Sequence, residues 1–217
     1  MTIVFSATGT VGHGYNVSVL TSDITVPNGS NRYLIARVGF DNKSATATAK
    51  AGGVAMTKIS EYSGGATDRH IMFGLVAPAV GAVTVVVSGS AAIFGMVASL
   101  CYVGVNQAAP TGAVTDGLYS GSVASATGNL IIDGFYQGRG NAGQATMTPG
   151  SGQTQRVNTS WKDPDNNWLN MAMSEKAAIA TTIMGWTSNQ TYEEREMLVE
   201  LLPAGAAVTF IPQMGMY

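Results

Sequence analysis

Apolar residues recur at every second position in several short segments of the chain. Between Arg32 and Phe40 the even-numbered positions from Leu34 onward are apolar, whereas Arg37 lies among the odd-numbered positions. Side chains that alternate in this way point to opposite faces of a β-strand, so one face of this segment is expected to lie on a core. The same period recurs in residues 83–88, 130–133 and 169–174. The pattern is typical of antiparallel sheets with one buried face.

The longest uncharged segment runs from Ile71 to Thr115 and raises the question of a membrane span. Glycine, proline and serine interrupt it, and the pieces between them are rich in valine, which favours strands over a spanning helix. Residues 93–103 are apolar at both odd and even positions, as expected for a central strand covered on both faces. We therefore predict two buried strands around a turn at residues 88–90, and no membrane partner.

Turn-forming residues separate many further segments with strand character. Short strands are expected at residues 16–20, 24–26, 54–59, 70–76, 181–186, 197–202 and 208–211. Residues 193–202 have the best helical pattern, but Pro203 follows at once and the apolar residues alternate, so a strand is favoured. The polar stretch at residues 137–155 is expected to form a loop or hairpin. Together these features predict an all-β fold, a two-sheet antiparallel sandwich that is jelly-roll-like.

Composition narrows the class of protein further. With 217 residues, 46% hydrophobic residues, 27 glycines and only 11% charged residues, the chain is too apolar for disorder and too poor in charge for a helical bundle. Eleven basic and thirteen acidic residues give a net charge of −2, which offers no basic surface to nucleic acid. Cys101 is the only cysteine, so no internal disulfide is possible. No basic residue precedes the short apolar start of the chain, so secretion is not expected.

No residue pattern identifies a catalytic site. His13 and His70 are far apart in sequence and neither has metal-ligand spacing, so each is expected to be structural or exposed. Glu61, Asp68 and Asp133 are candidates to pair with a histidine or another acid, but the sequence gives no reason to choose among them. We therefore predict no catalytic residue and no enzyme activity.

Two motifs resemble ligand sites without completing them. Residues 138–143 match the Gly-x-Gly-x-x-Gly fingerprint of dinucleotide-binding proteins, but no helix follows that would hold a pyrophosphate. Asp163, Asp165 and Asn167 resemble the start of a calcium loop, but Trp168 stands where that loop needs glycine. A turn built on the Asx side chains is favoured over a cation site. We therefore predict neither a cofactor nor a metal.

Tryptophan residues provide a second kind of candidate site. Trp161 and Trp168 flank a polar turn, and sugar rings stack their apolar faces on exposed aromatic planes. A glycan-stacking role for this pair is the alternative to burial in the core, which is favoured for Trp186 and for the set as a whole.

The order of several segments resembles a known β-sandwich module. The segments that carry the resemblance are residues 52–57, 75–85, 103–112, 128–133 and 200–204. They resemble a module that recurs in tailed-phage virion proteins of the decoration or adhesin type and in some bacterial surface proteins. The resemblance covers residues 24–204, and its motifs are turns and strands. It implies a noncatalytic structural or adhesive role in a virion, and no active-site residue.

Two segments flank the resembling region. Residues 1–23 are expected to be an N-terminal extension or the first strands, and residues 205–217 an apolar C-terminal tail. A short apolar tail can add a strand to a neighbouring subunit or fold back on its own domain, and the sequence leaves both open. The residues that we predict to dock a partner are Phe210, Ile211, Met214, Met216 and Tyr217.

The resemblance and the tail lead to two functional hypotheses. The first is a capsid decoration or cement subunit that docks on the capsid shell or other virion proteins, as a homo-oligomer and possibly a trimer. The second is a tail-associated adhesin or carbohydrate-binding module that uses Trp161 and Trp168. A hydrolase that acts on surface polysaccharide ranks last, because nothing in the sequence points to its paired carboxylates.

Overall fold

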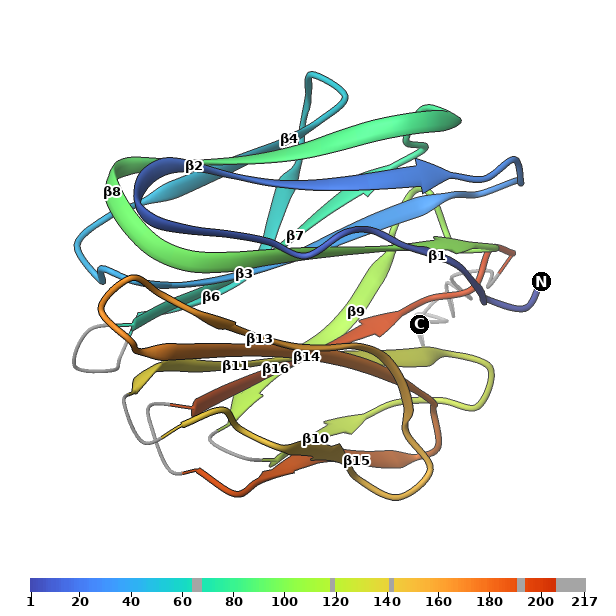
Figure 1. Cartoon of the computed structure of the whole chain (residues 1–217). Helices are drawn as coiled ribbons and strands as arrows, with labels where there is room; N and C mark the ends of the chain where they lie inside the picture. The colour runs from blue at the N-terminus through green and yellow to red at the C-terminus, as the bar shows by residue number, and fades with distance from the viewer. Residues whose placement is uncertain (64–67, 118–119, 141–142, 191–193, 206–217) are drawn as a thin grey trace, which may run out of the picture.

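The computed structural model describes residues 1–63, 68–117, 120–140, 143–190 and 194–205, and every regular element among them is a β-strand (Figure 1). The strands are β1 (Val4–Thr8), β2 (Gly12–Val26), β3 (Tyr33–Asp41), β4 (Ala47–Ala51), β5 (Val54–Ala55), β6 (Thr57–Tyr62), β7 (Asp68–Val76), β8 (Gly81–Val103), β9 (Thr111–Gly117), β10 (Ser120–Ala124), β11 (Leu130–Gly140), β12 (Met147–Pro149), β13 (Thr154–Lys162), β14 (Trp168–Ala177), β15 (Thr181–Ser188) and β16 (Glu194–Leu201). The predicted all-β, antiparallel sandwich class is confirmed. No helix in these residues is long and apolar enough to cross a membrane.

Hydrogen bonds divide the strands into three antiparallel sheets, one more than the sequence pattern predicted. The first has eight strands in the order β5-β4-β8-β3-β7-β6, with β1 and β2 also paired to β8. The second has the order β13-β14-β11-β16-β9, and the third the order β10-β15-β12. Residues 193–202 were expected to form a strand, and β16 confirms this for their described part.

Strand β8 corrects the predicted turn at residues 88–90. The chain makes no tight hairpin turn there, because β8 is one continuous strand from Gly81 to Val103 that bends round and returns in the next layer (Figure 1). Its partner β2 follows the curve through register shifts between Gly14 and Val19. The first half of β8 pairs with β4 and the second half with β3 and β1. The eight-stranded sheet therefore folds over itself.

Four hydrophobic clusters lie between the resulting layers. The first fills the fold of the eight-stranded sheet and includes Leu34, Phe40 and Val85. The second joins this sheet to the five-stranded sheet and includes Tyr102 and Tyr136. Two smaller clusters lie between the five-stranded and three-stranded sheets. Every sheet thus buries at least one face against another layer (Figure 1).

Both faces of β3 are buried, which corrects the expectation of a single core face. Leu34 and Phe40 face the first cluster, while Ile35 belongs to the second. A strand at the centre of a stack has a second layer on its other side, and the local pattern of one strand cannot reveal that layer. As a result Arg37, which was expected on the outer face, lies fully buried between two sheets.

The flanking segments differ in how far the structure describes them. Residues 4–8 and 12–26 are the first two strands of the eight-stranded sheet. The C-terminal tail is described only as far as Gly205, so the predicted strand at residues 208–211 lies outside the described residues. The same holds for the predicted docking residues Phe210, Ile211, Met214, Met216 and Tyr217.

Candidate functional site

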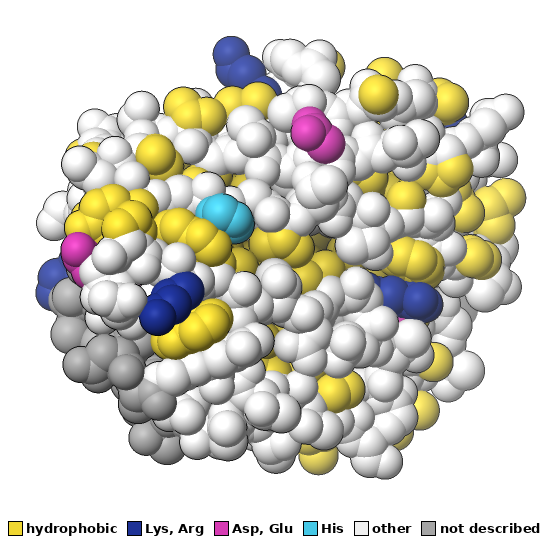
Figure 2. Space-filling model, in the orientation of Figure 1, with side chains coloured by type: hydrophobic (Ala, Val, Ile, Leu, Met, Phe, Trp, Pro, Cys, Tyr) yellow, Lys and Arg dark blue, Asp and Glu magenta, His cyan; other side chains and the backbone are white. Residues whose placement is uncertain are grey.

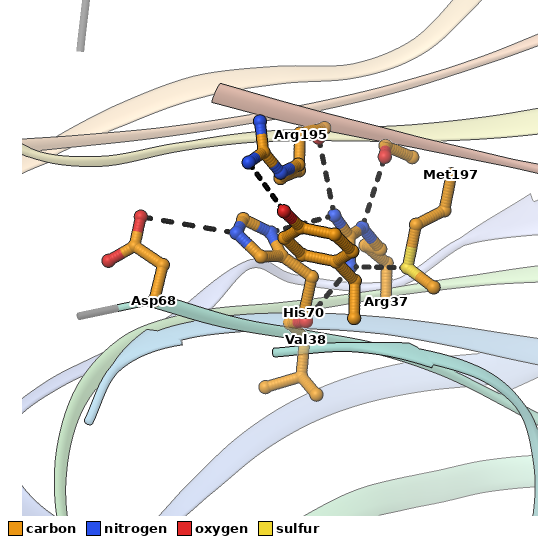
Figure 3. Close-up of polar contacts among 8 residues, drawn as sticks. Arg37, Val38, Asp68, His70, Arg195 and Met197 are labelled. Carbon is orange, nitrogen blue, oxygen red and sulfur yellow. Dashed lines mark hydrogen bonds and ion pairs between the residues drawn. The ribbon is translucent and has the colours of Figure 1, made fainter. Parts of the chain in front are cut away.

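A buried polar cluster lies between the eight-stranded and five-stranded sheets. Its centre is Arg37 on β3, which is 0% exposed (Figure 3). The Nε of Arg37 donates to the carbonyl of Gly134 on β11 at 3.1 Å, and Nη2 donates to the carbonyl of Arg195 on β16 at 3.4 Å. Nη1 donates to the carbonyl of Val38 and to the Sδ of Met197. One guanidinium thereby connects strands of two sheets.

Burial strongly affects the charge of this guanidinium. Loss of solvent lowers the pKa of Arg37 to about 9, although the nearby Tyr136, Asp133 and Glu196 favour the charged form. Arg37 therefore remains charged at neutral pH. A buried cation is tolerated only where hydrogen bonds replace its water, and here backbone carbonyls, a thioether and a histidine do so.

His70 on β7 is the nearest titratable neighbour of Arg37. Its Nδ1 lies 3.1 Å from Arg37 Nη2, and because a guanidinium only donates, Nδ1 is the acceptor and carries no proton. Its Nε2 lies 3.9 Å from an oxygen of Asp68 (Figure 3). Burial, together with the charges of Arg37 and Arg195, lowers the pKa of His70 well below its usual value. The imidazole is therefore neutral.

This arrangement contains the groups of an acid-base centre, but a substrate has no access to them. Arg37 and His70 are 0% exposed and Asp68 is 1% exposed. The rings of Tyr136 and His70 also form a T-shaped contact, with a centroid distance of 5.2 Å. The cluster can fix how two sheets pack against each other. The expectation that His70 is structural agrees with this geometry.

A second buried cluster lies on the opposite face of β11 and β16. The two oxygens of Asp133 accept hydrogen bonds from the backbone and hydroxyl of Ser174, from Gln153 Nε2 and from Trp186 Nε1, at 2.6–2.9 Å. Burial raises the pKa of Asp133 to about 6. Burial and the adjacent Asp133 raise the pKa of Glu196 to about 10, so Glu196 is protonated at neutral pH.

This carboxyl pair anchors the outer sheet. Trp186 belongs to β15, and Gln153 Oε1 also accepts from the backbone of Gly185 on the same strand at 2.8 Å. Gln153 and Trp186 line a surface cavity of about 470 Å³. Asp133 and Glu196 lie beneath that lining and are 0% exposed. Carboxyls with widely separated pKa values are typical of acid-base catalysis, but these two are sealed from any substrate in the cavity.

A groove at the surface separates two sheet edges. Strand β6 ends the eight-stranded sheet and β9 ends the five-stranded sheet. The groove between them has a volume of about 650 Å³. Its apolar walls include Val76 and Val114, each 39% exposed, and Lys58 is the only charged residue in its described lining. Lys58 forms an ion pair with Glu61, which also pairs with Arg69 at 2.5 Å.

The structure places the two candidate tryptophans on opposite faces of one sheet. Trp161 is paired with Leu169 and Trp168 with Lys162, and since paired residues share a face, the two rings point apart. Trp161 stacks on His13 at a centroid distance of 4.4 Å. Lys162 Nζ lies 5.9 Å over the Trp168 ring. Each ring would have to bind a sugar alone.

The described residues contain no group of three or more acidic, histidine or cysteine side chains that could hold a metal. Asp163 takes part in a turn, since its carbonyl accepts from the N–H of Asn166 at 3.0 Å. Its Oδ1 accepts from the backbone N–H of Asn167 at 2.8 Å, and Asn166 has a positive φ of 67°. The turn connects β13 to β14, and Asp165 accepts a hydrogen bond from Tyr15 of β2.

Several of these residues were within reach of sequence reasoning. Asp68, Glu61 and Asp133 were candidates for pairing, and the structure places Asp68 beside His70 and Asp133 beside Glu196. The centre of the first cluster, Arg37, was missed. A single arginine in an otherwise apolar segment was the available signal.

Fold and site together define the class of this protein as an all-β sandwich in which the described histidine and carboxyl clusters are sealed between sheets. Comparisons with protein-family models, with curated proteins and with solved structures find no match to this chain. The resemblance to a tailed-phage module therefore remains a prediction.

Proposed function

We propose that this chain is a structural protein of a tailed-phage virion, where it serves as a capsid decoration or cement subunit. The observation that carries the proposal is the contrast between interior and surface. Arg37, His70, Asp133 and Glu196 are fully buried, so their chemistry serves the packing of the sheets. The surface offers sheet edges and uncharged side chains, with few charges on the face in Figure 2. Such a surface suits extended contact with other proteins.

The proposed partners are the capsid shell or other virion proteins, together with further copies of the chain. A homo-oligomer, possibly a trimer, would present several copies of the docking surface to a symmetric shell. The C-terminal residues Phe210, Ile211, Met214, Met216 and Tyr217 are proposed to contribute to this docking. The net charge of −2 argues against a nucleic-acid partner.

Binding to particles tests the proposal. Capsids that lack the chain are prepared from the phage whose genome encodes it. The purified chain is added to these capsids, and the particles are sedimented. Saturable binding at a fixed number of copies per capsid is expected, with greater resistance of the capsids to heat. Failure of the chain to sediment with the capsids would contradict a role as a decoration subunit.

The alternative function is that of a tail-associated adhesin or carbohydrate-binding module. Trp168 supports it, because the ring is partly exposed and the apolar face of a sugar can stack on an exposed aromatic plane. Glycan-array binding that is lost in Trp168→Ala would select this function. Trp161→Ala tests the second ring separately, since the two rings lie on opposite faces of the sheet.

A further inference from the structure

The groove between β6 and β9 has the features of a seat for an extended chain. Each of its two walls is formed by a strand at the edge of a sheet. Within the described residues, β6 is hydrogen-bonded only to β7 and β9 only to β16. Unpaired strand edges bind extended segments through backbone hydrogen bonds, and pockets beside them take alternate side chains. The groove volume of about 650 Å³ is large enough for several side chains.

The lining of the groove suits an uncharged apolar occupant. Val76 and Val114 remain 39% exposed, and Ile59 also lines the groove. The only charge in the described lining, on Lys58, is already paired with Glu61. Residues 206–217 contain no charged side chain and include Val208, two further apolar residues at 210 and 211, and two methionines. An occupant of this composition leaves no charge unpaired in the groove.

The described chain before residue 206 shows where the C-terminal tail starts relative to the groove. The N–H of Leu202 donates to the carbonyl of Pro110, which lines the groove, at 3.0 Å. Two residues later, Ala204 donates to Gly104 at 2.7 Å and accepts from the N-terminal amine of Met1 at 3.2 Å. Gly104 follows β8, which lies two strands from β7 in the sheet order. The last described residues therefore pass the rim of the groove at Pro110, and Ala204 is held by Gly104 and Met1, which do not line it.

We propose that the groove between β6 and β9 receives residues 206–217 of a second copy of this chain. The proposal rests on the proposed function, because it names the contact through which a docking subunit would join its neighbours. A segment of this length spans about 40 Å when extended, which is enough to reach an adjacent subunit. If each tail passes to the next copy around a ring, the assembly closes with cyclic symmetry, as a trimer when three copies take part.

Disulfide trapping between two full-length variants tests the proposal. One variant carries Val114→Cys in the groove and the other carries Ile211→Cys in the tail, so a disulfide between the two variants requires the tail of one chain at the groove of another. The native Cys101 is 0% exposed, and burial raises its pKa to about 11, which keeps it unreactive. A matched control replaces Val114→Cys by Val19→Cys, a valine on β2 that is 45% exposed.

We expect the groove-tail pair to give at least about tenfold more mixed disulfide than the control pair. Equal yields from the two pairs would overturn the proposal. So would a chain with both Val114→Cys and Ile211→Cys that closes an internal disulfide while the mixture gives none, because the tail would then occupy its own groove.

Light scattering of Val114→Arg and Val19→Arg provides a second measurement, without cysteines. Dissociation of the oligomer in Val114→Arg alone is expected, and identical masses for the two variants would contradict the proposal. Capsid sedimentation separates this inference from the proposed function. If the unmodified chain binds capsids while trapping fails, the groove assignment is wrong and the decoration role stands.

Discussion

The guanidinium of Arg37 on β3 lies directly against Gly134 on β11 of the facing sheet. Its Nε donates to the Gly134 carbonyl at 3.1 Å, and a Cβ built at position 134 would lie 2.6 Å from Arg37 Cδ. The side chain thus needs both the carbonyl and the space above the glycine. Two strands that are far apart in sequence are joined by a contact that tolerates little change on either side.

Replacement of Arg37 by methionine is expected to lower the free energy of unfolding by about 2–4 kcal/mol. Methionine fills part of the space but leaves the Gly134 carbonyl and His70 Nδ1 without this donor. Urea unfolding measures the loss, and Lys50→Met on the exposed face of β4 is the control for removing a positive charge. Equal unfolding midpoints for the two variants would show that Arg37 does not hold the sheets together.

Gly134→Ala is expected to destabilise the protein by about 1–3 kcal/mol, because the new methyl group overlaps the Arg37 side chain. The cause is tested by a double-mutant cycle with Arg37→Met, measured by urea unfolding. The cost of the alanine should be smaller in the Arg37→Met background, since methionine is more flexible. An unchanged cost would place the strain elsewhere on β11.

The buried carboxyl Glu196 is expected to make stability fall as the pH rises. Its pKa is raised from 4.5 to about 10 by burial, so the folded chain keeps a proton that the unfolded chain has lost throughout this range. The unfolded state then binds fewer protons, and the free energy of unfolding decreases by up to about 1.4 kcal/mol per pH unit. Glu196→Gln should remove this contribution.

Urea unfolding of the wild-type chain and Glu196→Gln between about pH 5 and pH 9 measures the effect. The wild-type slope is expected to be clearly steeper. Parallel slopes for the two proteins would mean that Glu196 titrates near its ordinary pKa in the folded state.

Trp186→Phe is expected to loosen the three-stranded sheet. The substitution keeps an aromatic ring but removes the Nε1 donor, which lies 2.9 Å from Asp133 Oδ2. Loss of a hydrogen bond to a buried carboxylate costs about 1.5–3 kcal/mol. Hydrogen exchange should show faster opening of β15 than in Trp168→Phe, the control on β14. The same exchange rates in both variants would argue against an anchoring role for Asp133.

The strands were largely predictable from the sequence because alternation is a local property. Residues 32–40 and 169–174 show their period of two directly, and the structure places strands β3 and β14 there. The curvature of β8 was missed because Ser88, Gly89 and Ser90 are typical turn residues. Long-range pairing with β2 and β4 keeps the chain extended through this point, and no local pattern reports that pairing.

The buried clusters were less predictable than the strands. Arg37 and Gly134 are 97 positions apart, and their contact depends on how two sheets stack. A single sequence states which residues alternate but not which face meets a second layer. Glu61, Asp68 and Asp133 were candidates for pairing by their chemistry alone, and only the fold buries Asp68 and Asp133 between sheets.

The proposed role as a capsid decoration subunit is tested most directly by electron cryomicroscopy of virions of the phage whose genome encodes this chain. The account predicts the chain as a regular array on the outer surface of the capsid shell, with the same number of copies on every particle. Density for the chain at the tail tip would support the adhesin alternative instead. Virions that contain no copy of the chain would contradict a structural role in the particle.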